Sequence, residues 1–138
     1  MKHILIAYEE SPVSDHVLER TAELAKAFGA RVTVTSVAPV LVGAGHGIGP
    51  YDPPDPPERH AREVHDAISR LGELGVHGAT AAPLVGDAVD VIVELAKDRQ
   101  CDLIAIGAHE GGLVSRLAHG SIGDSIVHRS AVDVLVVR

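Results

Sequence analysis

The chain has 138 residues, of which 46% are hydrophobic, and its 12 Lys and Arg against 19 Asp and Glu give a net charge of −7. This length suits one domain, which can bury a core without disulfides or metals. The acidic balance, with no basic run, excludes the counter-ion release on which nucleic-acid binding depends.

No stretch approaches the ~18 consecutive apolar residues of a membrane span, and the chain enters an apolar run directly after Lys2. The single cysteine, Cys101, has no partner for an internal disulfide and is predicted to be a small buried residue at a strand entrance. We therefore expect a cytoplasmic chain without membrane contact.

Short runs rich in Val, Ile, Leu and Thr predict strands at residues 3–8, 31–37, 79–85, 102–107 and 132–138. Apolar residues at helical spacing predict helices at residues 12–28, 58–74, 88–98 and 120–129.

Capping residues support three of these helix ends. Ser11 and Pro12 are predicted as the N-cap and first position of the first helix, Gly29 as its stop, and Asp87 as the N-cap of the third helix. The second helix is expected to bury Ala61, Val64, Ile68 and Leu71.

Strands and helices alternate, with crossovers too long for hairpins. This order predicts an α/β fold in which residues 1–138 form one domain, a five-stranded parallel sheet with helices on both faces. The first strand should lie beside the fourth.

Residues 38–57 interrupt the alternation with four glycines and six prolines. The glycines at positions 43, 45, 47 and 49 do not fit G-x-G-x-x-G, and no helix follows them directly. We interpret the segment as a flexible lid or an exposed linker.

Two segments at strand ends are candidate ligand sites. Gly107, Gly120 and Ser121 belong to a strand-to-helix crossover that offers backbone N–H groups to phosphate, or Gly120 and Ser121 merely turn the chain and cap the last helix. Glu9 could accept a hydrogen bond from a ribose hydroxyl, or Glu9 and Glu10 are solvated residues at the positive end of the first helix.

Metal and nucleophile motifs are lacking. His60 and His65 do not form HExxH, so no metal site is assigned. G-x-S-x-G and G-x-x-x-x-G-K are also absent, so an enzyme, at most a slow ATPase, is the less favoured class.

Residues 4–11, Gly86, residues 102–107, the spacing Gly107-x2-Glu110-x9-Gly120-Ser121 and residues 132–137 together resemble the universal stress protein family over the whole length. The resemblance implies a parallel α/β sandwich and stress-associated binding rather than metabolic catalysis. It also implies a homodimer joined through the final strand, from Val132 to Arg138, with protein partners that are not identified.

In this family an adenine nucleotide such as ATP lies over the carboxyl ends of the first and fourth strands, with Mg²⁺ as a candidate companion. The resemblance implies an adenine side formed by Ala7, Glu9 and the backbone near Val37. It implies a phosphate side formed by Gly107, His109, Glu110, Gly120, Ser121 and Ile122.

Two positions depart from the family pattern: Glu9 replaces an aspartate, and Glu110 replaces the second glycine of the loop. A carboxylate ~4 Å from a phosphate costs about 1 kcal/mol in water and about 4 kcal/mol at an effective dielectric near 20. A bound Mg²⁺, or Gly111 and Gly112, could offset this charge. The leading hypothesis is a dimeric regulatory module that binds an adenine nucleotide, and the alternative is a stress protein that acts through protein–protein contact alone.

Overall fold

A five-stranded parallel sheet forms the centre of the protein, whose computed structural model describes residues 1–40, 56–108 and 122–138. Its strands lie in the order β4-β2-β1-β6-β7, with every neighbouring pair parallel. The strands are β1 (His3–Ala7), β2 (Arg31–Thr35), β4 (Thr80–Ala81), β6 (Leu103–Gly107) and β7 (Asp133–Val137). The predicted parallel sheet is confirmed, and so is the position of the first strand beside the fourth, β6.

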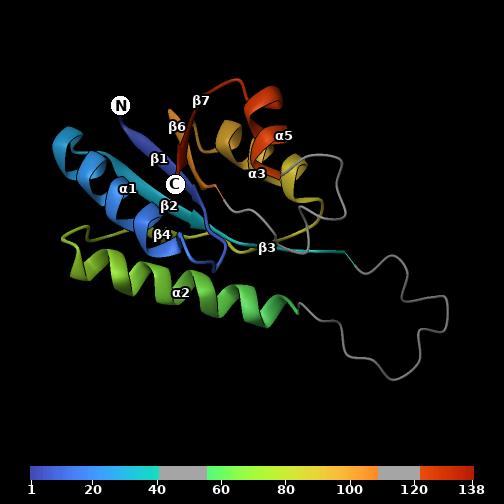
Figure 1. Cartoon of the computed structure of the whole chain (residues 1–138), viewed down its shortest axis with the longest axis horizontal. Coiled ribbons are helices and arrows are strands. Elements are labelled where there is room, and N and C mark those ends of the chain that lie inside the picture. The colour runs from blue at the N-terminus through green and yellow to red at the C-terminus, as the bar shows by residue number, and fades with distance from the viewer. Residues whose placement is uncertain (41–55, 109–121) are drawn as a thin grey trace, which may run out of the picture.

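Helices cover both faces of the sheet, as predicted (Figure 1). On one face lie α1 (Ser14–Phe28) and α2 (Pro57–Glu73), and on the other lie α3 (Ala88–Asp98) and α5 (Ile122–Arg129). None of these described helices has both the length and the apolar character needed to span a membrane.

The side chains of β1 alternate between two hydrophobic cores. Ile4 and Ile6 pack with α1 and α2, whereas Leu5 packs with α3 and α5, and all three are fully buried. Burying one such side chain contributes roughly 1.5–3 kcal/mol. An apolar run without polar alternation therefore specifies a central strand that is covered on both faces.

Two of the predicted strands are each broken into two pieces. The chain leaves β2 at Ser36 and forms β3 (Val37–Ala38), which pairs in parallel with β5 (Leu84–Val85) in a second, two-stranded sheet. Pro83, which lacks an N–H group, separates β4 from β5. Single strands over residues 31–37 and 79–85 are therefore wrong in detail.

The predicted caps are correct for α3 and for the end of α1, but not for its start. The Asp87 carboxylate accepts a hydrogen bond from the Asp90 N–H at 3.1 Å, and Gly29 adopts the left-handed conformation with φ of 64°. However, α1 begins at Ser14, with Val13 as its N-cap and no side-chain cap. Ser11 instead forms a turn before the helix, because its hydroxyl oxygen accepts from the Val13 N–H at 3.3 Å.

A buried network of hydrogen bonds surrounds His3 at the amino edge of the sheet. Its Nδ1 lies 3.1 Å from the Arg99 carbonyl oxygen, so Nδ1 carries the proton and donates. Its Nε2 therefore accepts from the Thr33 hydroxyl at 2.8 Å, and Thr33 Oγ1 lies 2.8 Å from Thr80 Oγ1. The network joins β1, β2, β4 and the end of α3 through a neutral imidazole.

Gly107 at the end of β6 is required for close packing rather than for an unusual backbone angle. Its φ is not positive, but a Cβ at this position would lie 2.8 Å from Val13 Cγ2 and 3.3 Å from Val17 Cγ2. A glycine therefore lets α1 lie directly against the carboxyl end of β6.

The buried state of His3 makes stability dependent on pH. Burial lowers the pKa of His3 from 6.5, so below about that pH the unfolded chain takes up a proton that the folded chain does not. The His3 contribution is therefore present above pH 6.5 and is lost as the pH falls below it. The difference in free energy of unfolding between the wild type and His3→Gln, measured by urea denaturation, should shrink from pH 7 to pH 5. A difference that is constant over this range would contradict this prediction.

Gly107→Ala should destabilise the fold by about 1–3 kcal/mol, because its Cβ would overlap Val13 and force α1 away from the sheet. Gly72→Ala is the matched control, since Gly72 lies in α2 with open space around it and should gain about 0.5–1 kcal/mol from helix propensity. Urea denaturation of both variants measures the two free energies of unfolding. Equal stabilities of the two variants would show that the space around Gly107 is not limiting.

Candidate functional site

A pocket lies at the carboxyl ends of β1 and β6, where the strand order reverses. From β1 the sheet continues through β2 to β4 on one side, and from β6 to β7 on the other. Ligands of open α/β sheets bind in the crevice that such a reversal leaves. The cavity has a volume of about 130 Å³.

Five of the residues predicted from the sequence line this one pocket. They are Ala7, Glu9, Val37, Gly107 and Ile122. The other four predicted site residues, His109, Glu110, Gly120 and Ser121, lie outside the described residues. The adenine-side residues thus come together in space, although they follow three different strands.

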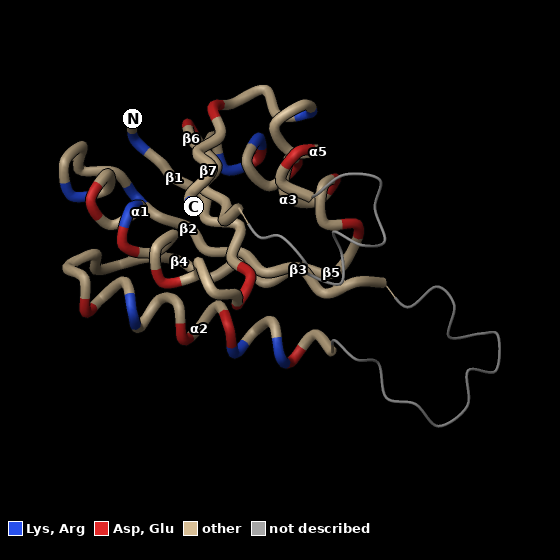
Figure 2. Tube along the Cα trace, viewed as in Figure 1, with Lys and Arg blue, Asp and Glu red and all other residues tan. Residues whose placement is uncertain are grey.

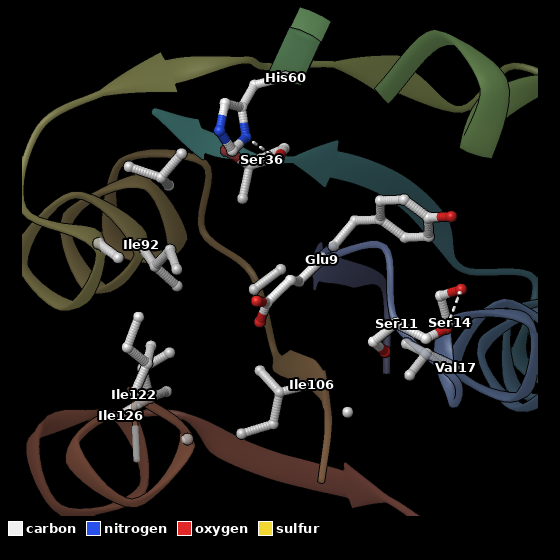
Figure 3. Close-up of a pocket in the computed structure, with 17 residues that line it drawn as sticks. Glu9, Ser11, Ser14, Val17, Ser36, His60, Ile92, Ile106, Ile122 and Ile126 are labelled. Carbon is white, nitrogen blue, oxygen red and sulfur yellow. Dashed lines mark hydrogen bonds between the residues drawn. The ribbon is translucent and has the colours of Figure 1, made fainter. Parts of the chain in front are cut away.

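One wall of the pocket is aliphatic. It consists of Ala88 and Ile92 from α3, Ile106 from β6, and Ile122 and Ile126 from α5 (Figure 3). Ile92, Ile106 and Ile126 are buried and belong to the core between the sheet and these two helices. The wall is a fixed apolar surface against which a flat ring could pack.

The opposite wall carries hydroxyl groups. Tyr8, Ser11, Ser14 and Ser36 line it, and the Ser14 hydroxyl donates to the Ser11 carbonyl oxygen at 2.8 Å (Figure 3). Burial raises the pKa of Tyr8, so its phenol remains protonated at neutral pH and can donate a hydrogen bond. This wall offers neutral polar groups.

A buried polar network fixes α2 to the junction between β2 and β3. The Ser36 hydroxyl lies 2.5 Å from His60 Nδ1 and 3.3 Å from Glu63 Oε2, and Arg59 Nε donates to Glu63 Oε1 at 3.1 Å. His60 and Glu63 are both about 9% exposed. Because the network ends on Ser36, it anchors the backbone directly beside Val37.

The same network does not have the geometry of a catalytic triad. In a triad the carboxylate bonds to the ring nitrogen that faces away from the serine. Here the Glu63 carboxylate lies 3.7 Å from His60 Nδ1, the nitrogen that already contacts Ser36. The arrangement suits positioning of the chain rather than activation of Ser36 as a nucleophile.

The sequence prediction missed His60 and Glu63 and wrongly placed Ala61 on the buried face of α2. The buried residues of this helix are His60, Glu63, Val64, Ala67 and Leu71, whereas Ala61 is exposed. The signal was present, because positions 60, 64, 67 and 71 repeat at helical spacing. It was overlooked because His and Glu usually lie on the solvent side.

The backbone of Val37 presents a hydrogen-bond donor and acceptor away from its strand partner. The Leu84 N–H donates to the Ser36 carbonyl at 3.0 Å, and the Gly86 N–H donates to the Ala38 carbonyl at 2.9 Å. Alternation along a strand therefore turns the Val37 N–H and C=O to the opposite edge of β3. Val37 lines the pocket, so this pair is available to a ligand.

Within residues 1–40, 56–108 and 122–138, no three His, Cys, Asp or Glu side chains converge in a way that could hold a metal ion.

Comparison with known proteins agrees with the resemblance found in the sequence. Residues 1–138 match the model of the universal stress protein family. Universal stress protein A homolog 1 of Coxiella burnetii is 32% identical over 139 residues, which cover 99% of this chain and 95% of that protein.

Solved structures share the fold. A universal stress protein in complex with cAMP is 26% identical with a TM-score of 0.71, and the match covers 99% of this chain and 96% of that one. The universal stress protein from Archaeoglobus fulgidus in complex with dAMP is 22% identical with a TM-score of 0.66, covering 100% and 98%. The full-length family match and the curated relative, together with this fold, establish that the chain belongs to the universal stress protein family.

Proposed function

We propose that this protein binds an adenine nucleotide in the pocket at the carboxyl ends of β1 and β6, and that it acts as a regulatory module. The observation that carries the proposal is the free donor and acceptor pair of the Val37 backbone beside the isoleucine wall. Adenine has a flat apolar face, and one edge bears an amino donor next to a ring-nitrogen acceptor. That edge complements a carbonyl and an N–H from one residue.

The size of the cavity supports a base as the buried part of the ligand. Its volume is about 130 Å³, close to the ~150 Å³ of an engineered cavity that binds benzene. A whole nucleotide is larger, so its sugar and phosphate would extend past Gly107 and the start of α5 at Ile122. These two residues line the same pocket.

Glu9 is placed to contact the sugar. Its carboxylate is directed into the pocket from the end of β1 (Figure 3). An ionised carboxylate only accepts hydrogen bonds, and the ribose hydroxyls are donors that can satisfy it. The relative solved with cAMP supports an adenine ligand, since it is 26% identical over nearly the whole chain.

A second candidate function is binding of protein partners without any nucleotide. It is favoured by Glu9 itself, whose negative charge lies in the crevice where a phosphorylated ligand would enter. If Glu110 also faced that crevice, the two carboxylates would oppose phosphate together.

Calorimetric titration of the nucleotide-stripped protein with AMP, and with ATP and Mg²⁺, tests the nucleotide proposal. We expect binding by the wild type and about 3- to 10-fold weaker binding by Val37→Pro, which removes the free N–H donor. The substitution leaves the pairing of β3 with β5 intact, because this N–H faces away from β5. Val37→Ile, which keeps the N–H, is the matched control and should bind as the wild type does.

The same titration separates the two candidate functions through a Glu110→Gly variant. Binding by the wild type means that the loop or a metal accommodates Glu110. Binding by the variant alone would mean that Glu110 blocks the site, and the protein would then act through protein contacts. Equal affinities of Val37→Pro and Val37→Ile would contradict the role of the Val37 backbone.

We also propose that the protein forms a homodimer through β7. This strand is at one end of the sheet, so one row of its backbone hydrogen-bonding groups has no strand beside it among the described residues. Val136 on this strand is 41% exposed, and Val134 and Leu135 are half-buried. An exposed apolar edge strand is a site for pairing with a second chain.

Val136→Lys should convert the dimer to a monomer, because it places a charge on the exposed edge without disturbing the core. Leu135 is less suitable for this test because it packs against the core. Val85→Lys is the control, since Val85 is similarly exposed at 54% but lies in the second sheet. Light scattering gives both masses, and an unchanged dimer mass for Val136→Lys would rule out this interface.

A further inference from the structure

The lining of the pocket has an unusual charge for a site that faces phosphate. Among its described lining residues Glu9 is the only one that carries Asp, Glu, Lys or Arg chemistry, and Glu10 beside it is also exposed. The rest of the lining is aliphatic, hydroxyl-bearing or glycine, together with His60. The described lining therefore supplies no lysine or arginine to balance a phosphate charge.

The ends of the helices add to this negative character. Each helix runs antiparallel to the strands, so its positive N-terminal end lies at the same edge of the sheet as the pocket. Every described helix carries an acidic residue in its first turn: Asp15 in α1, Glu58 in α2, Asp90 in α3 and Asp124 in α5. These carboxylates offset the partial positive charge that would otherwise attract an anion.

The cations gather at the opposite edge of the sheet (Figure 2). Basic residues in the last turns, or at the amino ends of strands, are Lys2, Lys26, Arg31, Lys97 and Arg99. Arg129 is in the last turn of α5 and pairs with Asp90 at 2.5 Å. The fold is thus polarised, with an acidic carboxyl edge and a basic amino edge.

We infer that the pocket selects adenine ligands by their charge and prefers those with no more than one negative charge, such as a nucleoside or a cyclic monophosphate, over di- and triphosphates. This inference rests on the proposed function and specifies its ligand class. A carboxylate ~4 Å from each added phosphate charge lowers affinity about fivefold even in a water-like dielectric. Successive phosphates therefore weaken binding, whereas the contacts to the base stay the same.

Titration calorimetry without divalent cations tests this selection with adenosine, cAMP, AMP, ADP and ATP. At about 0.01 M salt, where charges act over ~30 Å, adenosine and cAMP should bind most tightly, and ATP should bind at least about 25-fold more weakly. Raising the salt to about 0.15 M screens the repulsion, so ATP should bind more tightly while adenosine stays unchanged. A site that attracts phosphate by positive charge would show the opposite response to salt.

Glu9→Gln provides the matched variant, because it keeps an acceptor oxygen and removes the charge. We expect it to raise the affinity for ATP relative to that for adenosine by about fivefold. Glu94→Gln removes an exposed charge from the body of α3, away from its first turn, and should leave this ratio unchanged. Melting curves of both variants establish that they remain folded.

The outcomes distinguish the inference from the proposed function beneath it. Tighter binding of ATP than of adenosine at low salt, or weakening of ATP binding by salt, would overturn charge selection while nucleotide binding stood. Absence of binding by all five compounds would overturn the proposed function and the selection with it.

Discussion

The parallel pairing of β1 with β6 brings together two segments that most of the chain separates. The register Ile4–Leu103, Leu5–Ile104 and Ile6–Ala105 sets both strands to end at the same edge. Because β2 and β4 continue from β1 while β7 continues from β6, the helices on the two sides diverge there and leave a pocket. The side chains that could meet a ligand are therefore positioned by the central strands.

The two faces of the sheet give the pocket two chemically different walls. The core under α3 and α5 supplies aliphatic side chains, and the junction of β2 with α2 supplies hydroxyl groups and the buried Ser36–His60–Glu63 network. The network holds Ser36 in place, and Ser36 precedes the one residue whose backbone faces the pocket. Recognition of a base thus depends on packing some distance from the ligand. The same architecture explains the charge distribution, because acids at helix starts and bases at helix ends stabilise each helix and collect at opposite edges of the sheet.

Much of this arrangement could be predicted from the sequence because buried parallel strands are nearly continuous apolar runs. Ala7, Glu9 and Gly107 follow such runs directly, so their common edge follows from the strand order. The break at Ser36 could not be predicted, since the run of Val and Thr around it has uniform strand propensity and only the pairing with β5 ends β2 there. Nor could burial of His60, because a polar side chain is buried only when its partners, here Ser36 and Glu63, are known. The reason for Gly107 was also hidden, as it lies in contact with α1.

The central claim is that an adenine base lies between the Val37 backbone and the isoleucine wall. Titration of ¹⁵N-labelled protein with adenosine, followed by amide chemical shifts, tests it most directly because adenosine has no charge to confuse the result. The account predicts the largest shifts at the amides of Val37, Ile92 and Ile122, with Lys2 and Arg31 at the far edge unaffected. Saturable shifts elsewhere, with these three amides unmoved, would contradict it.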